Sequence, residues 1–297
     1  MTTAIEKSRN ISSDELNRYL NEGLAMGQAS NAIDYKLADG LRYRYEVENC
    51  VKEMAGQDVK GKLKTAGVDK IVSIKVKEKE NKNKIAVLYA EGEIRDEDSS
   101  SPFSADEQVI SEEMANKLRK LKDDDDVKAV VFRVNSPGGS AYISEQIWKE
   151  VVELKAKKPI VVSMGNYAAS GGYYISCAAN KIVAERTTLT GSIGVFGVVR
   201  NFTGTFDKVG VTTDVVKTNT FADLGDMSRP MREDEKALIQ RGVEQTYDLF
   251  LTRCADGRGM TKAEIDSIGQ GRVWTGEQAL ERGLVDQLGG MDDAIKE

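Results

Sequence analysis

From residue 84 to residue 190, short apolar segments alternate with longer segments whose apolar residues recur at helical spacing. The apolar segments are IAVLYAEGEI, VKAVVFRV, PIVVSMG and KIVAE, and each predicts a strand. The segments between them predict helices over 105–122 and 141–155 and a third directly after Ser170. Strands that alternate with helices pair in parallel. Because these strands are apolar throughout, we predict an α/β fold whose sheet is covered on both faces.

The two ends of the chain are predicted to be mainly helical. Helices are expected within 11–55 and over 232–254, 262–268 and 276–282. A stretch rich in lysine and glycine separates the first helical segment from the strands, which predicts a connector with a short strand at 71–75. We therefore divide the chain into a helical segment 1–58, a linker 59–83 and an α/β domain 84–297.

Two parts of the chain resemble each other. The sequence ISSDELN from Ile11 is similar to MTKAEID from Met260, and each is followed by a second similar pair, ADGL and ERGL. The spacing between the paired segments differs by six residues. We therefore expect residues 1–58 to be the tail of one domain copy and residues 84–297 to be a second copy, so that the chain is a fragment of a tandem duplication.

Composition excludes several classes of function. Of the 297 residues, 40% are hydrophobic and 30% are charged, with a formal net charge of −6. This mild acidity, without a basic stripe interleaved with aromatic residues, argues against nucleic acid as a partner. No apolar run approaches the ~20 residues that span a bilayer, and the N-terminus lacks the apolar region of a secretory signal. We expect a soluble segment with no targeting signal of its own.

The chain has no histidine, and its three cysteines are widely spaced. Almost no ligand set for zinc remains, and the acidic run 123–126 is interpreted as a solvated loop, so neither a metal nor a cofactor is expected. The absence of histidine also means that a serine nucleophile here needs another base. Among a lysine, a carboxylate and a terminal amine, a desolvated lysine is favoured, because burial lowers its pKa towards neutrality.

Two turns rich in small residues follow predicted strands: NSPGGS at 135–140 and AASGG at 168–172. Paired glycines let backbone N–H groups face a ligand, and a serine at the start of a helix gains from the helix dipole. Each serine is equally well interpreted as an ordinary helix N-cap. Both turns nevertheless lie at the carboxyl ends of parallel strands, where α/β folds bind ligands. A third turn, TLTGSIG, offers Ser192 either to orient an amine base or to satisfy the turn backbone.

Four segments together resemble one family. NSPGGS, GNYAASGGYYIS, TLTGSIGVFGV and GRVWTGEQALERGLVD are similar to the signal peptide peptidase A (protease IV) family in its long, internally duplicated form, across residues 84–297. The resemblance implies the Clp-protease/crotonase superfamily fold of repeated ββα units. It implies Ser170 as the nucleophile, Gly139 and Gly171 as oxyanion-hole donors, and Ser192 as the hydroxyl that holds a lysine base.

The base departs from the family pattern. Short family members carry the lysine a few residues after a Val-Lys-Ser-Gly-like stretch, and the matching position here is Ala222. The resemblance implies that in long members the lysine comes from the first repeat, upstream of the segment similar to residues 1–58. We therefore expect a nucleophile and an oxyanion hole without their base. Lys217 is the only substitute that we name within the chain.

The resemblance implies a serine endopeptidase that degrades cleaved signal peptides and other apolar peptides. It also implies homo-oligomers, and a parent protein anchored in the inner membrane facing the periplasm through parts absent from this chain. Two alternatives stay open. One is a crotonase-like acyl-CoA enzyme, which uses the same pair of amides with acid/base carboxylates and no serine nucleophile. The other is a non-catalytic assembly or peptide-binding fragment, which Ala222 and the expected truncation favour.

Overall fold

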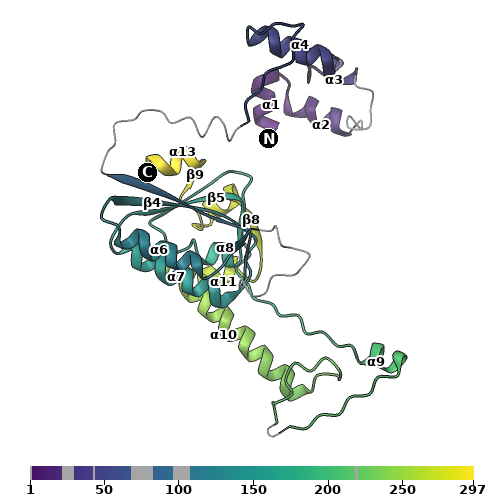
Figure 1. Cartoon of the computed structure of the whole chain (residues 1–297), viewed down its shortest axis with the longest axis vertical. Helices are drawn as coiled ribbons and strands as arrows, with labels where there is room; N and C mark the ends of the chain where they lie inside the picture. The colour runs from purple at the N-terminus through teal and green to yellow at the C-terminus, as the bar shows by residue number, and fades with distance from the viewer. Residues whose placement is uncertain (1, 22–29, 43, 68–82, 96–107, 218–219) are drawn as a thin grey trace. The chain divides into compact units, whose positions relative to one another are not determined.

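The computed structural model describes residues 2–21, 30–42, 44–67, 83–95, 108–217 and 220–297 (Figure 1). The chain divides into two compact units, Met1–Lys79 and Glu80–Glu297. Each unit is described by itself. The strand predicted at 71–75 lies outside the described residues. Within the part of the chain that the structure describes, no helix has both the length and the apolar character needed to cross a membrane.

The N-terminal unit is helical. Its described helices are α1 (Thr2–Arg9), α2 (Ser13–Asn21), α3 (Asn31–Asp34) and α4 (Arg44–Met54). Ile11, Leu16 and Tyr19 form a small buried cluster, and the ring of Tyr19 stacks on that of Tyr35 at 4.1 Å. The helical character predicted for residues 11–55 is confirmed for α2, α3 and α4.

The second unit contains a seven-stranded, mostly parallel sheet (Figure 1). Its strands are β1 (Lys84–Glu91), β4 (Val127–Ser136), β5 (Ile160–Ala169), β6 (Lys181–Ala184), β7 (Leu189–Gly191), β8 (Val273–Thr275) and β9 (Gln287–Leu288). The order is β1-β4-β5-β6-β9, with β7 parallel to β5 and β8 antiparallel to β7. A separate two-stranded sheet pairs β2 (Glu93–Ile94) with β3 (Val109–Ile110).

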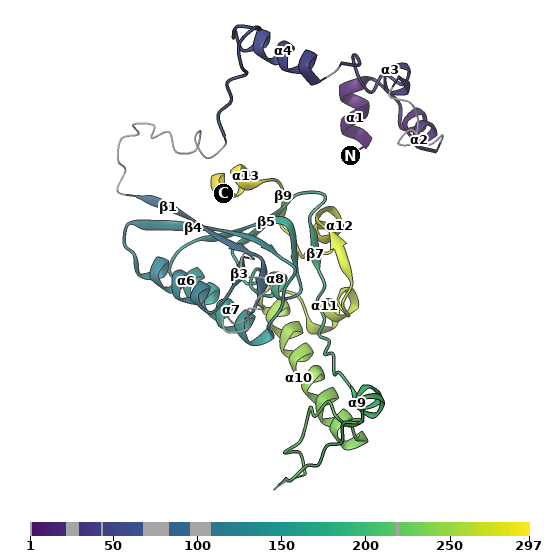
Figure 2. The same cartoon turned by 45° about the vertical axis from the view of Figure 1, so that its right-hand side comes forward.

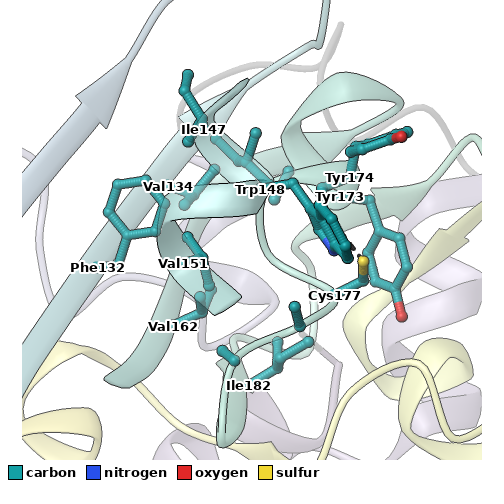
Figure 3. Packing of buried hydrophobic residues seen from close by; sticks show 14 of the residues in the cluster. Phe132, Val134, Ile147, Trp148, Val151, Val162, Tyr173, Tyr174, Cys177 and Ile182 are labelled. Carbon is teal, nitrogen blue, oxygen red and sulfur yellow. Dashed lines mark hydrogen bonds between the residues drawn. The ribbon is translucent and has the colours of Figure 1, made fainter. Parts of the chain in front are cut away.

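Helices cover the sheet unequally. They are α6 (Glu113–Asp123), α7 (Ala141–Lys155), α8 (Gly171–Tyr174), α9 (Thr203–Val209), α10 (Glu233–Arg258), α11 (Lys262–Ile268), α12 (Gly276–Glu281) and α13 (Met291–Lys296). Both views place α6 and α7 on one face of the sheet and α13 on the other (Figures 1 and 2). Figure 3 shows Phe132 and Val162 of the sheet packed near Val151 of α7, and all three are fully buried. This main core holds the strand ends that carry the two turns.

Two of the predictions are wrong in detail. The outward-facing side chains of β1, Ile85, Val87 and Tyr89, are 51%, 38% and 57% exposed, so the sheet is not covered on both faces at this strand. Apolar content alone does not reveal that β1 lies at the end of the sheet order. The helix predicted over 105–122 is also shorter, because Val109 and Ile110 form strand β3 and α6 begins at Glu113.

After β7 the chain leaves the sheet in a long excursion that we call the arm, described for residues 195–217 and 220–232 (Figures 1 and 2). Arg229 links the end of the arm to the start of α10, since its Nη2 lies 2.7 Å from Asp223 Oδ2 and 2.6 Å from Glu235 Oε1. The hydrogen bond from Arg229 lowers the pKa of Glu235 to about 2. Hydrogen bonds from Lys217 and Arg229 hold the pKa of Asp223 well below its usual range.

Replacing Arg229 with methionine should lower the thermal unfolding midpoint by a few degrees at pH 7, because the two largely buried carboxylates of Asp223 and Glu235 lose one of the two arginines, Arg229 and Arg232, that they share. Carboxylates with lowered pKa values stabilise the fold above their unfolded pKa of about 4.5, and that contribution is lost as the pH falls towards 2. The difference between variant and wild type should therefore become smaller as the pH falls below about 4.5. Calorimetry at pH 7, 4.5 and 3 measures this, with Arg186→Met, which removes an exposed ion pair to Glu277, as the control. A midpoint difference that is unchanged at pH 3 would contradict the ionic role.

Candidate active site

The first glycine-rich turn leaves the end of β4 and is tied to β2. Ser136 is fully buried, and its Oγ accepts a hydrogen bond from the N–H of Gly138 at 3.1 Å. The N–H of Ile94 donates to the carbonyl of Gly138 at 2.8 Å, and the N–H of Ser140 donates to the carbonyl of Ile94 at 2.7 Å. Gly138 and Gly139 have φ values of +100° and +147°, which glycine adopts without steric cost. The two bonds to Ile94 involve the residues on either side of Gly139, and the N–H of Gly139 takes part in neither.

Ser140 is an ordinary helix cap, as the simpler of the two interpretations predicts. Its Oγ accepts a hydrogen bond from the N–H of Ile143 at 3.3 Å, at the start of α7. Ser170 behaves differently. Its side chain makes no capping hydrogen bond to α8, which begins at the next residue and is four residues long. The hydroxyl of Ser170 is therefore not used for capping.

Ser170 also has a strained backbone, with φ of +52° and ψ of −120°. Non-glycine residues adopt positive φ rarely, and such conformations gather at functional sites because the surrounding structure must hold them. One such support is the N–H of Ser170, which donates to the carbonyl of Gly191 at 2.9 Å.

The two glycine-rich turns touch. A Cβ placed on Gly138 would lie 2.6 Å from the nitrogen of Gly171 and 2.8 Å from the Cβ of Ser170. Within the described residues, no hydrogen bond uses the N–H of Gly139 or of Gly171 as a donor to the protein. The structure thus brings together a serine hydroxyl and two glycine amides, the arrangement that an oxyanion hole requires.

The third turn reaches the same place through strand pairing. Gly191 of β7 lies opposite Ala169 of β5, which puts Ser192 close in register to Ser170. Ser192 also has a positive φ, of +48°, and its N–H donates to the carbonyl of Arg272 at 2.7 Å. Ser170, Ser192, Gly139 and Gly171 all line one cavity of about 960 Å³.

The far wall of this cavity comes from α10 and α8 and is aromatic. Tyr174, Tyr247 and Phe250 line it, and the rings of Tyr174 and Phe250 lie 4.7 Å apart. The hydroxyl of Tyr174 donates to Glu145 Oε2 at 2.6 Å, and Arg253 Nη2 lies 2.5 Å from Glu145 Oε1. Sequence analysis did not identify this wall. The signal was present as Tyr247, Phe250 and Cys254, spaced three and four residues apart on one helix face.

Among the described residues that line the cavity there is no amine side chain that could accept a proton from Ser170. Burial and the hydrogen bond to Glu145 raise the pKa of Tyr174 well above its usual range, and burial raises the pKa of Tyr247 to about 12, so both phenols stay protonated at neutral pH. Among the described residues that line the cavity, Glu93 is the one charged side chain. The structure thus gathers Ser170 and the glycine amides in one cavity, and no lysine is among the described residues that line it.

Lys217 lies elsewhere. Its Nζ forms an ion pair with Asp223 Oδ1 at 3.0 Å within the arm. Arg229 in turn links Asp223 to Glu235. Glu235 precedes the cavity residue Tyr247 by twelve positions on α10, which corresponds to about 18 Å of helix. The structure therefore does not bring Lys217 to Ser170, and we do not retain it as a substitute base.

The cysteines and acidic residues form no metal centre in the described part of the chain. No group of three or more histidine, cysteine, aspartate or glutamate side chains gathers there in a way that could hold an ion. Cys177 and Cys254 are fully buried, and burial, with Cys177 nearby, raises the pKa of the Cys254 thiol. Both side chains lie in the core.

Comparisons with known proteins define the class and then the family. Residues 100–193 match the Clp protease family model, so the second unit has a Clp-protease-like α/β fold. A ClpP1 variant from Listeria monocytogenes is structurally similar, with a TM-score of 0.47 and 15% identity over 70% of this chain and 94% of that one. Residues 152–297 match the model of peptidase family S49.

Two curated relatives support the second match. "Putative signal peptide peptidase SppA" of Enterococcus faecium is 38% identical over 77% of this chain and 67% of its own length. "Protease 4" of Salmonella typhi is 40% identical over 90% of this chain and 42% of its own length. The chain belongs to peptidase family S49. It spans less than half the length of the first curated relatives that it matches.

Proposed function

We propose that this chain is the nucleophile-bearing part of an S49 serine endopeptidase. The observation that carries the proposal is the position of Ser170 beside two glycine amides in one cavity. Its backbone is strained and its hydroxyl makes no capping hydrogen bond to α8. Its Oγ would attack the carbonyl carbon of a peptide, and the N–H groups of Gly139 and Gly171 would stabilise the oxyanion. Collapse of the tetrahedral intermediate breaks the C–N bond and leaves an acyl-enzyme, which water hydrolyses.

The proton of Ser170 must pass to a base and from the base to the leaving amine. We assign that role to a lysine that lies outside this sequence, in the upstream part of the full-length protein, with Ser192 holding its amine. Two findings support this. Among the described residues no lysine lines the cavity, and the chain covers only part of its longer relatives. In this account the chain alone is inactive or nearly so.

The cavity favours extended apolar peptides. Its wall carries Tyr174, Phe250 and Phe196, and a peptide that adds as a strand beside β2 would present alternate side chains to it. We propose cleaved signal peptides and similar apolar peptides as substrates of a homo-oligomeric enzyme. For the parent protein we propose anchoring in the inner membrane, facing the periplasm.

A fluorophosphonate probe tests the nucleophile directly. The probe phosphonylates an activated serine with loss of fluoride, so mass spectrometry should find the adduct on the peptide that contains Ser170. A crotonase-like enzyme would carry no adduct there, and a peptide-binding fragment would bind substrate without labelling or turnover. The experiment should compare the chain alone with the chain plus the upstream part supplied in trans, because deprotonation of Ser170 requires the base.

A further inference from the structure

Strand β5 contains a bulge just before the proposed nucleophile. Val134 of β4 pairs with Met164 of β5, whereas Ser136 pairs with Ala168. β4 therefore advances two residues while β5 advances four. Bulges of this kind bend a strand and redirect the side chains that follow, and they occur next to active sites. Here the redirected segment leads into Ser170.

The bulge also changes the neighbour of β5. Before it, residues 161–163 pair with β6, and after it, residues 167–169 pair with β7. This second pairing brings Gly191 to the N–H of Ser170 and Ser192 into the cavity. The geometry of the bulge thus sets the relative positions of both proposed site serines.

The side chain of Asn135 holds the bulge in place. Its Oδ1 accepts hydrogen bonds from the N–H of Asn166 at 3.0 Å and from the N–H of Tyr167 at 3.3 Å, two donors that the interrupted β4–β5 pairing does not use. A Cβ on Gly165 would lie 2.7 Å from this oxygen, so the glycine gives Asn135 its room. Thr188, the residue before β7, donates from its Oγ1 to the carbonyl of Gly165 at 2.8 Å.

We propose that Asn135 is a positioning residue that acts through this bulge to align Ser170 with the amides of Gly139 and Gly171. The proposal rests on the proposed function, because it concerns the alignment of that nucleophile. Asn135 lines no part of the cavity and does not touch the reacting atoms. Its effect is on alignment: a misplacement of about 1 Å in an active site lowers rates by about 10²-fold.

The chain offers a matched control on the same strand. Asn180 Oδ1 accepts a hydrogen bond from the N–H of Ile160 at 2.9 Å, at the opposite end of β5. Asn180 and Asn135 therefore make the same kind of contact to one strand, but only Asn135 is next to the bulge. A purely structural role predicts similar behaviour of the two residues, whereas positioning predicts a difference in reactivity.

The experiment compares Asn135→Ala, Asn135→Asp and Asn180→Ala by fluorophosphonate labelling of the chain with the upstream part in trans, together with thermal unfolding. Asn135→Ala should lower the maximal labelling rate by about 10-fold to 100-fold with little change in the probe concentration at half-maximal rate. Asn135→Asp keeps an acceptor for both N–H groups and should restore the rate to within about threefold of wild type. Asn180→Ala should label like wild type. Equal effects of the two alanine variants, or no recovery with aspartate, would overturn the proposal.

A second measurement separates this proposal from the proposed function. If the wild-type chain takes no label even with the upstream part supplied in trans, the proposed function fails, and amide hydrogen exchange still tests the role of Asn135. Exchange across residues 165–172 should be about tenfold faster in Asn135→Ala than in wild type and unchanged in Asn180→Ala. Unchanged exchange in Asn135→Ala would overturn the positioning role whatever the labelling shows.

Discussion

Alanine at position 170 should remove peptide hydrolysis, lowering kcat/KM by at least about 10⁴-fold in the chain combined with its upstream part. The reason is that the other two serine hydroxyls in the described lining of the cavity have other partners: Ser144 Oγ donates to the carbonyl of Ser140 at 2.8 Å, and Ser192 is assigned to the base. Thermal unfolding of Ser170→Ala should stay near wild type or rise slightly, since the substitution removes no capping hydrogen bond.

Ser140→Ala is the matched control for this variant. It removes a serine hydroxyl from the neighbouring turn, where the hydroxyl caps α7, and should cost about 1 kcal/mol of stability with activity retained. Steady-state hydrolysis of a fluorogenic apolar peptide measures both variants. Activity in Ser170→Ala comparable to that in Ser140→Ala would show that the nucleophile lies elsewhere.

Alanine at position 138 should lower kcat by about 10²-fold to 10³-fold, the effect of losing an oxyanion-hole donor. The new Cβ would lie 2.6 Å from the nitrogen of Gly171 and 2.8 Å from the carbonyl oxygen of Ala169, so the two turns must move apart. Positive φ at this position adds backbone strain. KM should change less than kcat, because the amides act mainly on the charge that develops in the transition state.

Gly210→Ala is the control that separates the effect of backbone strain from the effect of moving the two turns apart. Gly210 also has a positive φ, of +71°, but a Cβ there would meet no atom within 4 Å. Its variant should lose some stability and keep its activity. Calorimetry beside the kinetic assay shows whether Gly138→Ala is folded. A folded Gly138→Ala protein with wild-type kcat would remove these amides from the mechanism.

Local signals predicted the elements whose ends are capped. The helix expected over 141–155 is α7, where Ser140 provides the cap. The helix expected over 262–268 is α11, and a reciprocal pair of hydrogen bonds between Thr261 and Glu264 fixes its start. In both cases the cap and the apolar period lie within a few residues of each other.

The sequence predicted where the turns lie along the chain but not their conformation. Glycines next to Ser170 marked the turn, whereas the bulge in β5 depends on Asn135, more than thirty residues away, and on pairing with β7. The aromatic wall from α10 depends on how that helix packs on α8. Both depend on long-range contacts. A local pattern, such as the spacing of Tyr247 and Phe250, can mark the residues on one helix face but not their position at the cavity.

The internal similarity has a structural counterpart. Ser12 and Glu15 exchange the same pair of hydrogen bonds at the start of α2 as Thr261 and Glu264 do at the start of α11. The residue after each glutamate, Leu16 or Ile265, is buried. These contacts support the proposal that residues 1–58 are the tail of an earlier copy.

The measurement that tests the central claim most directly is peptide hydrolysis by this chain with and without the upstream part supplied in trans. The account predicts hydrolysis only when both are present, and loss of that activity in Ser170→Ala, because the nucleophile and its amides lie here and the amine base does not. Full hydrolysis by the chain alone would contradict it.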